Sequence, residues 1–448
     1  MTTASRTSLG QLLSLAAPIA FGQAGIALMG LIDTAVVGRL GAGPLGAVGL
    51  ANGLFFAVAV MGIGAMMGLD PLFSQAFGAG NSQRARELGL QALWLALLVT
   101  LALAVPMACL PLLMKPAGIA PDVARDASWF LWLRMPGLWP TFAFVGLRSY
   151  LSSAHIVKPL VISTILANGL NLVLDLWFVF GGLGLPALGA PGAGLATSLC
   201  ALLQFAVMLW AARKLGRAEV RGANFGDLRK ALRVGIPVGM QMGAEVGVFA
   251  LVGVLAGRLD KGSLAAHQVA IALASFTFCA AVGVGQAGTV SVGRAVGARD
   301  TTGARRAGLL AFLCGGGIMS FSALAFWLAP GAVARLLTDR PEVMAVAVPL
   351  LSVCAVFQIS DGVQAVGAGV LRGAGDTRWP FVANVVGHYF VGLPIAIWLG
   401  LHRGLGVIGL WWGLCAGLTA VAVFLLARFL WLSAREIVPL EHGVPLHG

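Results

Sequence analysis

The sequence predicts an all-α integral membrane protein with twelve transmembrane helices in two pseudo-symmetric six-helix lobes. The 448 residues are 59% hydrophobic and 10% charged, with a mean hydropathy of +0.92, whereas charged residues make up about a quarter of an average soluble protein. Apolar segments long enough to cross a bilayer recur along the chain, and landmarks of the first half recur in the second. These three observations exclude an ordinary soluble protein.

Twelve apolar segments have the length of a membrane-spanning helix, about 20 residues. We expect spans at 12–37, 46–70, 88–113, 127–147, 157–180, 191–212, 232–256, 263–290, 307–331, 343–370, 379–400 and 405–432. The first is longer than the apolar part of a signal peptide and leads into further spans without a convincing cleavage site, so we expect it to be retained.

The longest polar stretch separates two very apolar halves. It carries seven Lys and Arg against Glu219 and Asp227, a charge density that no bilayer interior would tolerate. The sequence therefore predicts an N-lobe at 1–211 (helices 1–6), a basic linker at 212–233, a C-lobe at 234–434 (helices 7–12) and a tail at 435–448.

The formal net charge of +12 is best explained by membrane topology. The basic residues form short runs between apolar segments, with no basic face carrying interleaved aromatics, so nucleic acid is not an expected partner. With the N-terminus inside, 20 of the 29 Lys and Arg fall on the cytoplasmic side, while the other nine, Arg134 among them, are scattered outside. The positive-inside rule therefore favours a cytoplasmic linker, tail and termini.

The two halves match at a nearly constant shift. The pairs 219 positions apart include Pro18 with Pro237, Gly38-Arg39-Leu40 with Gly257-Arg258-Leu259, Gly78-Ala79 with Gly297-Ala298, and Arg86 with Arg305. Six spans per half is an even number, so both halves enter from the same side and are related by an axis along the membrane normal. A cavity between two such bundles, opening alternately to each side, is the expected architecture.

Carboxylates within or near the spans are the first candidates for function. Each costs about 3 kcal/mol near a helix centre unless it faces a wet or polar interior. The five are Asp33, Asp70, Asp175, Glu245 and Asp361. Asp70 lies near the end of its span beside Pro71, where a structural role is favoured. For the other four, the alternative is that they merely hydrogen-bond helices together.

Polar neighbours at helical spacing surround these carboxylates. The stripes are Asn168, Asn171 and Asp175; Gln241 and Glu245; and Gln358, Asp361 and Gln364. Because burial disfavours the charged form of a carboxyl group, such groups can exchange protons near neutral pH. The same oxygens could instead hold Na⁺. A Na⁺ site at Glu245 and Asp361 would receive no oxygen from Phe357. We further expect a substrate cavity lined by Gln241, Gln268, Phe357, Gln358, Gln364 and His388.

Other motifs carry no chemistry of their own. The string Gly283-Val284-Gly285-Gln286-Ala287-Gly288 fits a dinucleotide-binding pattern, but it lies inside a span and follows no strand, so helix packing explains it better. The chain has no P-loop string, and the six cysteines lie in apolar segments without metal-ligand spacing. With no nucleophile-base pair at useful spacing, we expect neither an enzyme nor a cofactor.

Several short strings together resemble the multidrug and toxic compound extrusion (MATE) transporters over residues 10–432. They are Leu31-Ile32-Asp33-Thr34-Ala35-Val36-Val37-Gly38, Ser74-Gln75-Ala76-Phe77-Gly78-Ala79-Gly80, Asn171 with Asp175, Gly235-Ile236-Pro237, Gly243-Ala244-Glu245, the run from Phe357 to Gln364, and the run from Leu371 to Thr377. Glu245 together with Asp361 is similar to the NorM-type branch rather than the DinF-type branch.

The resemblance implies the MATE fold and export of mostly cationic, amphipathic drugs, driven by entry of H⁺ or Na⁺ across the bacterial inner membrane. It would make Asp33, Asn171 and Asp175 the N-lobe coupling site, and Glu245 with Asp361 the C-lobe site. We expect a monomer in the lipid bilayer. A flippase of lipid-linked precursors with a related fold, or an exporter of one specific metabolite, remains an alternative.

Overall fold

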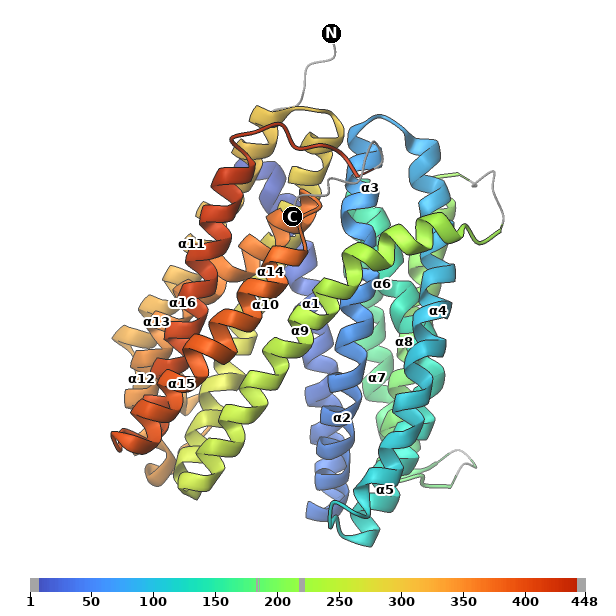
Figure 1. Cartoon of the computed structure of the whole chain (residues 1–448). Coiled ribbons are helices and arrows are strands. Elements are labelled where there is room, and N and C mark those ends of the chain that lie inside the picture. The colour runs from blue at the N-terminus through green and yellow to red at the C-terminus, as the bar shows by residue number, and fades with distance from the viewer. Residues whose placement is uncertain (1–7, 183, 185, 217–221, 441–448) are drawn as a thin grey trace. The chain divides into compact units, whose positions relative to one another are not determined.

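The computed structural model describes residues 8–182, 184, 186–216 and 222–440, and Figure 1 shows its helical elements. The first half contains α1 Leu9–Val37, η1 Gly38–Leu40, α2 Ala42–Met66, α3 Leu69–Gly78, α4 Ser82–Met114, α5 Pro121–Arg134, η2 Met135–Gly137, α6 Leu138–Ser153, α7 Lys158–Phe180 and α8 Ala190–Arg213. The second contains α9 Phe225–Leu259, α10 Lys261–Gly297, α11 Thr301–Leu328, α12 Pro330–Arg335, α13 Pro341–Gly373, α14 Arg378–Val385, η3 Val386–Gly392, α15 Leu393–Ile397, η4 Trp398–His402 and α16 Gly406–Leu432.

Eleven helical runs in the described part of the chain are long and apolar enough to cross a membrane. The predicted span 127–147 corresponds to α5, η2 and α6, where a turn of 3-10 helix interrupts the α-helix. Pro136 lies in that turn and lacks the backbone N–H that a continuous helix requires. The predicted span 379–400 falls on α14 to η4, where η3 and η4 are π-helical. The predicted fold class is confirmed.

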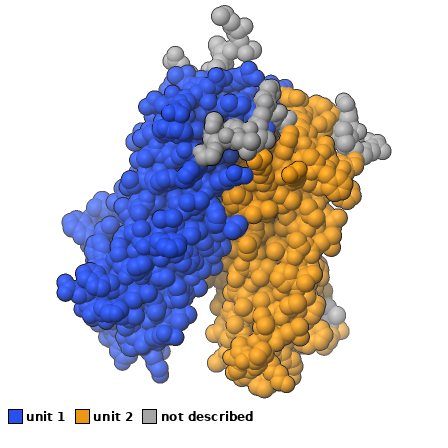
Figure 2. Space-filling model, viewed as in Figure 1, with its two compact units in different colours: residues 1–21, 74–80, 240–448 blue, residues 22–73, 81–239 orange. Residues whose placement is uncertain are grey.

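The chain divides into two compact units, coloured separately in Figure 2. Unit 1 comprises residues 1–21, 74–80 and 240–448, and unit 2 comprises residues 22–73 and 81–239. The helices α1, α3 and α9 therefore each contribute to both units. Contacts define these units, and the predicted linear division into lobes at the linker stays a prediction.

Apolar packing builds the core of unit 1 from α9, α10, α13 and α16. Val252, Leu350, Cys354 and Trp411 are fully buried in one cluster there. In unit 2, Cys200 is fully buried in a second cluster with side chains of α1, α7 and α8. The six cysteines are all free, and Cys200, Cys354 and Cys415 are buried.

Glycines bring α10 and α13 into backbone contact. A Cβ added at Gly369 would collide with the backbone of Gly285, and one added at Gly373 would lie 2.5 Å from the carbonyl oxygen of Thr289. The Thr289 hydroxyl donates a hydrogen bond of 2.8 Å to the carbonyl of Gly369. Because Gly285 belongs to the string predicted to serve packing, its contact with α13 accounts for that string.

Gly369→Val is expected to lower the stability of the protein by about 1–3 kcal/mol, because the branched side chain would force α10 and α13 apart. The matched control is Gly317→Val on α11, where an added Cβ would meet nothing within 4 Å. Apparent melting temperatures in detergent would measure both. Equal shifts for the two variants would contradict the packing role of Gly369.

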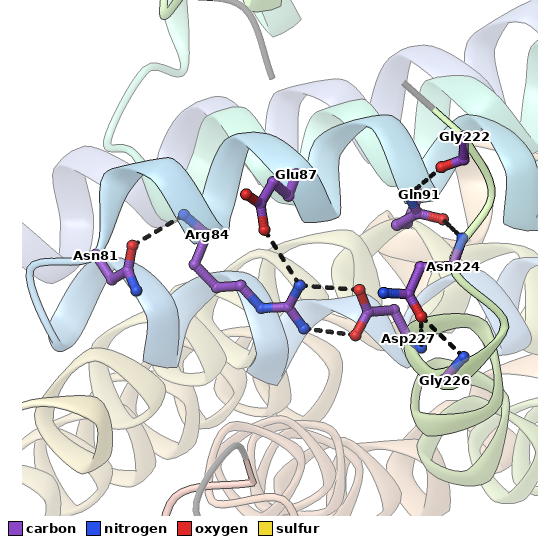
Figure 3. A network of polar contacts seen from close by, with 8 residues as sticks. All are labelled: Asn81, Arg84, Glu87, Gln91, Gly222, Asn224, Gly226 and Asp227. Atoms are coloured by element: carbon purple, nitrogen blue, oxygen red, sulfur yellow. Dashed lines mark hydrogen bonds and ion pairs between the residues drawn. The ribbon is translucent and has the colours of Figure 1, made fainter. Parts of the chain in front are cut away.

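Hydrogen bonds hold residues 222–227 of the predicted linker against α4, as Figure 3 shows. Arg84 donates two hydrogen bonds, of 2.8 and 2.5 Å, to the two carboxylate oxygens of Asp227. Gln91 donates to the carbonyl of Gly222 at 2.9 Å and accepts from the backbone N–H of Asn224 at 2.8 Å. The linker charges Arg217, Glu219 and Arg221 lie outside the described residues. We call these contacts between α4 and residues 222–227 the linker clasp.

The Arg84–Asp227 pair is expected to have a coupling energy of about 1.5–3 kcal/mol, since it is bidentate and only 18% and 7% exposed at its two side chains. Thermal unfolding of Arg84→Ala, Asp227→Ala and the double variant would give this energy as a double-mutant cycle. The pair Arg125–Asp126, whose arginine is 71% exposed, is the control, with less than about 1 kcal/mol expected. Equal coupling energies would contradict the structural role of the clasp.

The turns before α4 and α11 show the repeat in backbone geometry. Gly80 and Arg299 both have positive φ, 75° and 56°. The next residues, Asn81 and Asp300, each cap the following helix, accepting hydrogen bonds of 2.9 Å from the N–H of Arg84 and 2.8 Å from that of Gly303. The two turns lie 219 positions apart, as the sequence repeat predicts.

Candidate functional site

A carboxylate cluster lies within unit 2, where α1, α7 and α8 meet. Asp33 of α1 is 1% exposed, and Asn171 and Asp175, one turn apart on α7, are fully buried. The amide of Asn171 donates to Oδ1 of Asp33 at 2.9 Å, and the hydroxyl of Thr197 on α8 donates to Oδ2 at 3.0 Å. The structure thus brings together the three residues that the sequence assigned to this site.

The charges of this first cluster are not balanced by hydrogen bonds alone. Among the described residues, neither carboxylate oxygen of Asp175 has a hydrogen-bond partner, and Asp175 lies within Coulombic range of Asp33 and Arg134. Arg134 donates to Asn52 at 3.2 Å and lies over the ring of Phe55. Two carboxylates buried together repel one another, and the nearby Arg134 supplies a single positive charge. The cluster therefore has one more negative than positive charge when both carboxylates are ionised.

A second cluster lies within unit 1, formed by α9, α13 and α14. Glu245 of α9 accepts two long hydrogen bonds at Oε2, 3.3 Å from Gln364 of α13 and 3.5 Å from Asn384 of α14. Asp361, 4% exposed, lies one turn before Gln364 and within Coulombic range of Glu245. The structure thus brings the two predicted C-lobe carboxylates together.

Aromatic rings pack beside this second cluster. Phe357 of α13 is 2% exposed, and its ring centroid lies 5.9 Å from that of Phe249 and 5.4 Å from that of Trp411. Phe249 also lies 6.4 Å, between ring centroids, from the buried His388. An anionic group beside aromatic rings is the combination that favours an amphipathic organic cation.

Several polar atoms of the second cluster lack partners. In the described part of the chain, they are Oε1 of Gln358, Oε1 of Gln364, Oδ1 of Asn384 and both ring nitrogens of His388. Buried polar atoms are normally hydrogen-bonded, so these are available to a ligand or to water. No group of three or more His, Cys, Asp or Glu able to hold a metal was found among the described residues. A Na⁺ ion here would need the amide oxygens of Gln364 and Asn384 as well as the carboxylates.

The other predicted cavity residues fall in different environments. Gln241, one turn before Glu245 on α9, is buried, whereas Gln268 on α10 is exposed. His267, just before it, accepts a hydrogen bond of 3.1 Å at Nδ1 from the indole of Trp411.

Sequence reasoning missed Thr197 and Asn384, and it placed Arg134 among the outside charges. Nothing in the sequence separates Thr197 from other polar helix residues. In the structure its hydroxyl also donates to the carbonyl of Ala193, a bond that many helical threonines make. Asn384 lies four residues before His388, a helical spacing that could have indicated it. Arg134 ends α5 beside Asn52 and Phe55, a position that no loop count could give.

The sequence repeat does not duplicate the buried carboxylates. The counterpart of Asp33 at the 219 shift is Val252, which is fully buried in the apolar core, and the counterpart of Glu245 is Ile26, which is 48% exposed. The corresponding helices α1 and α9 therefore both carry a carboxylate, but at positions that have no acidic equivalent in the other half.

Repeated halves, membrane-spanning helices and buried carboxylate clusters define a multi-pass membrane transporter. The MatE family profile matches residues 18–177 and again residues 237–398, two segments offset by 219 positions at their starts and 221 at their ends. The chain belongs to this family, the MATE multidrug efflux transporters. The resemblance stated from the sequence is confirmed.

Curated relatives and solved structures agree. The chain is 34% identical over 442 residues to the probable multidrug resistance protein NorM of Mesorhizobium japonicum, covering 95% of this chain and 94% of the relative. It is 34% identical over 431 residues to NorM of Burkholderia vietnamiensis, with coverages of 93% and 92%. A crystal structure of the eukaryotic MATE transporter AtDTX14 has a TM-score of 0.86 at 22% identity, with coverages of 94% and 95%. A multidrug resistance MATE family transporter in an outward-facing conformation has a TM-score of 0.86 at 20% identity, covering 98% of each chain.

Proposed function

We propose that this protein exports cationic, amphipathic organic compounds in exchange for inward movement of H⁺ or Na⁺, by alternating access. The observation that carries the proposal is the first cluster, in which Asp33 and Asp175 are buried together and the oxygens of Asp175 lack partners among the described residues. A site that needs a positive charge can exchange one. In the second cluster, Glu245 and the neighbouring rings suit an organic cation.

Exchange requires that the two cations stabilise different states of the protein. A small cation that neutralises Asp33 and Asp175 favours the conformation in which they are buried, and a ligand shifts an equilibrium only by its differential affinity for two states. Entry of one positive charge yields about 2.3 kcal/mol per 100 mV. That free energy supports roughly a fiftyfold concentration gradient of an otherwise electroneutral compound.

The proposed setting is the bacterial cytoplasmic membrane, with both termini and the basic linker in the cytoplasm. The charge distribution of the sequence supports this topology. Arg84, Arg86, Arg305 and Arg306 all lie in the first two turns of α4 and α11, at ends of spans that the topology places inside. We propose a monomer without enzymatic activity or a resident cofactor.

Ethidium efflux from proteoliposomes tests the proposal. Purified wild-type protein would be reconstituted, and efflux followed under an imposed pH gradient, an imposed Na⁺ gradient, or neither. We expect one of the two gradients to accelerate efflux above the rate in protein-free liposomes. Folded protein that exports no ethidium under either gradient would contradict the proposal and favour the flippase of lipid-linked precursors.

A further inference from the structure

An exposed hollow of about 280 Å³ lies on the first three turns of α11. It is lined by Thr302, Arg305, Arg306, Leu309, Leu310 and Leu313. Both arginines are exposed, as is Leu313, at 73%. Among the described residues, neither guanidinium has a hydrogen-bond or ion-pair partner. The first and second clusters share no residue with this hollow.

The repeat shows what covers the equivalent surface in the first half. At the 219 shift, the face of α11 that carries the hollow corresponds to the face of α4 that carries Arg86, Glu87 and Gln91. On α4 that face is covered by the chain itself, because Arg86 donates to the carbonyl of Leu215 at 3.2 Å and Gln91 belongs to the linker clasp. Figure 3 shows Gln91 held between Gly222 and Asn224.

Two residue changes convert that polar docking face into a different surface on α11. The acid Glu87 is matched by the base Arg306, and the amide Gln91 is matched by Leu310. The conserved landmark of the repeat, Arg86 with Arg305, stays basic. A face that binds backbone groups of the chain on α4 is thus cationic at the end of α11 and apolar one turn further along.

Asp300, the acidic residue next to the hollow, is engaged in capping α11. Asp300 caps α11, and its Oδ1 accepts hydrogen bonds from the N–H of Gly303 at 2.8 Å and from the hydroxyl of Thr302 at 3.1 Å. Arg305 and Arg306 lie beyond this cap, in the second turn of a membrane-spanning helix. Cations at the end of such a helix lie at the level of lipid headgroups.

We propose that the hollow binds an anionic phospholipid, with its phosphate at Arg305 and Arg306 and an acyl chain along Leu309, Leu310 and Leu313. Guanidinium groups form charge-assisted hydrogen bonds to phosphate oxygens, and the leucines continue the contact toward the bilayer interior. The inference rests on the transmembrane placement of α11 and not on the compound exported. It can therefore fail or succeed independently of the proposed transport.

Lipid binding to the intact protein in neutral detergent, followed by native mass spectrometry, tests this inference. The probes are phosphatidylglycerol, phosphatidylcholine with the same acyl chains, and glycerol 3-phosphate, which has the phosphate without the chains. We expect phosphatidylglycerol to bind at least about tenfold more tightly than either other probe. Equal binding of phosphatidylcholine, or of glycerol 3-phosphate, would overturn the assignment, the latter in favour of a free phosphate site.

Two variants locate the lipid. Arg305→Gln with Arg306→Gln removes the charges, and Arg306→Glu with Leu310→Gln installs the residues that α4 has at the same positions. Both are expected to weaken phosphatidylglycerol binding at least about tenfold. The matched control, Arg229→Gln with Lys230→Gln, removes two exposed charges from the start of α9. Unchanged binding in both hollow variants, or an equal loss in the control, would overturn the proposal, and melting temperatures establish that each variant is folded.

Discussion

Asp33→Asn is expected to reduce gradient-driven ethidium efflux at least about tenfold, a change of about 1.4 kcal/mol or more. The amide keeps an oxygen for Asn171, and its NH₂ group can donate to the hydroxyl of Thr197, which can also accept. The packing is therefore retained while the charge is lost. Without that charge, the cluster has less need of the driving cation, so the inward gradient can no longer be used.

Asp300→Asn is the matched control for that variant. It removes a carboxylate from a helix cap whose counterpart in the repeat is already Asn81, so the cap should persist and efflux should stay within about twofold of wild type. Normal gradient-driven efflux by the Asp33 variant, with melting temperatures unchanged, would remove Asp33 from the coupling site.

Glu245→Gln is expected to weaken ethidium binding about five- to tenfold and to reduce efflux correspondingly. Its side-chain oxygen can still accept from Gln364 and Asn384, so the variant should fold. What is lost is the anionic charge near Phe249 and Phe357, which would attract an organic cation. Binding is measured by ethidium fluorescence in detergent.

Comparing the two variants tests whether ion coupling and ethidium binding belong to different halves of the protein. Because Asp33 and Glu245 have no acidic counterparts across the repeat, we expect Asp33→Asn to spare ethidium binding while abolishing coupling. Glu245→Gln should instead weaken binding most. Identical losses of ion coupling and of ethidium binding in both variants would contradict this division.

Much of the fold follows from the sequence because the bilayer imposes simple rules. A span needs about 20 apolar residues, so the α1, α7 and α16 segments could be placed within a few residues. The interruption at Pro136 and the π-helical turns of η3 and η4 could not, since these depend on how neighbouring helices satisfy the backbone. Each of α1, α3 and α9 is divided between the two units. This division depends on contacts in three dimensions, so hydropathy could not predict it.

The residues of the candidate site could also be predicted only in part. Buried carboxylates are costly, so Asp33, Asp175, Glu245 and Asp361 stand out in any apolar span. Thr197 does not stand out, because a hydroxyl can satisfy itself by bonding to its own helix, as that of Thr197 does at Ala193. Gln268 was predicted to line the cavity from its residue type, it is exposed on α10, and its role stays a prediction.

Simultaneous measurement of cation entry and ethidium exit in proteoliposomes tests the central claim most directly. Internal pH or internal Na⁺ would be recorded with a trapped indicator while external ethidium is followed by fluorescence. The proposal predicts cation entry that requires ethidium inside, stops when ethidium is exhausted, and is lost in Asp33→Asn. Ethidium exit from wild-type liposomes with no accompanying entry of H⁺ or Na⁺ would contradict it.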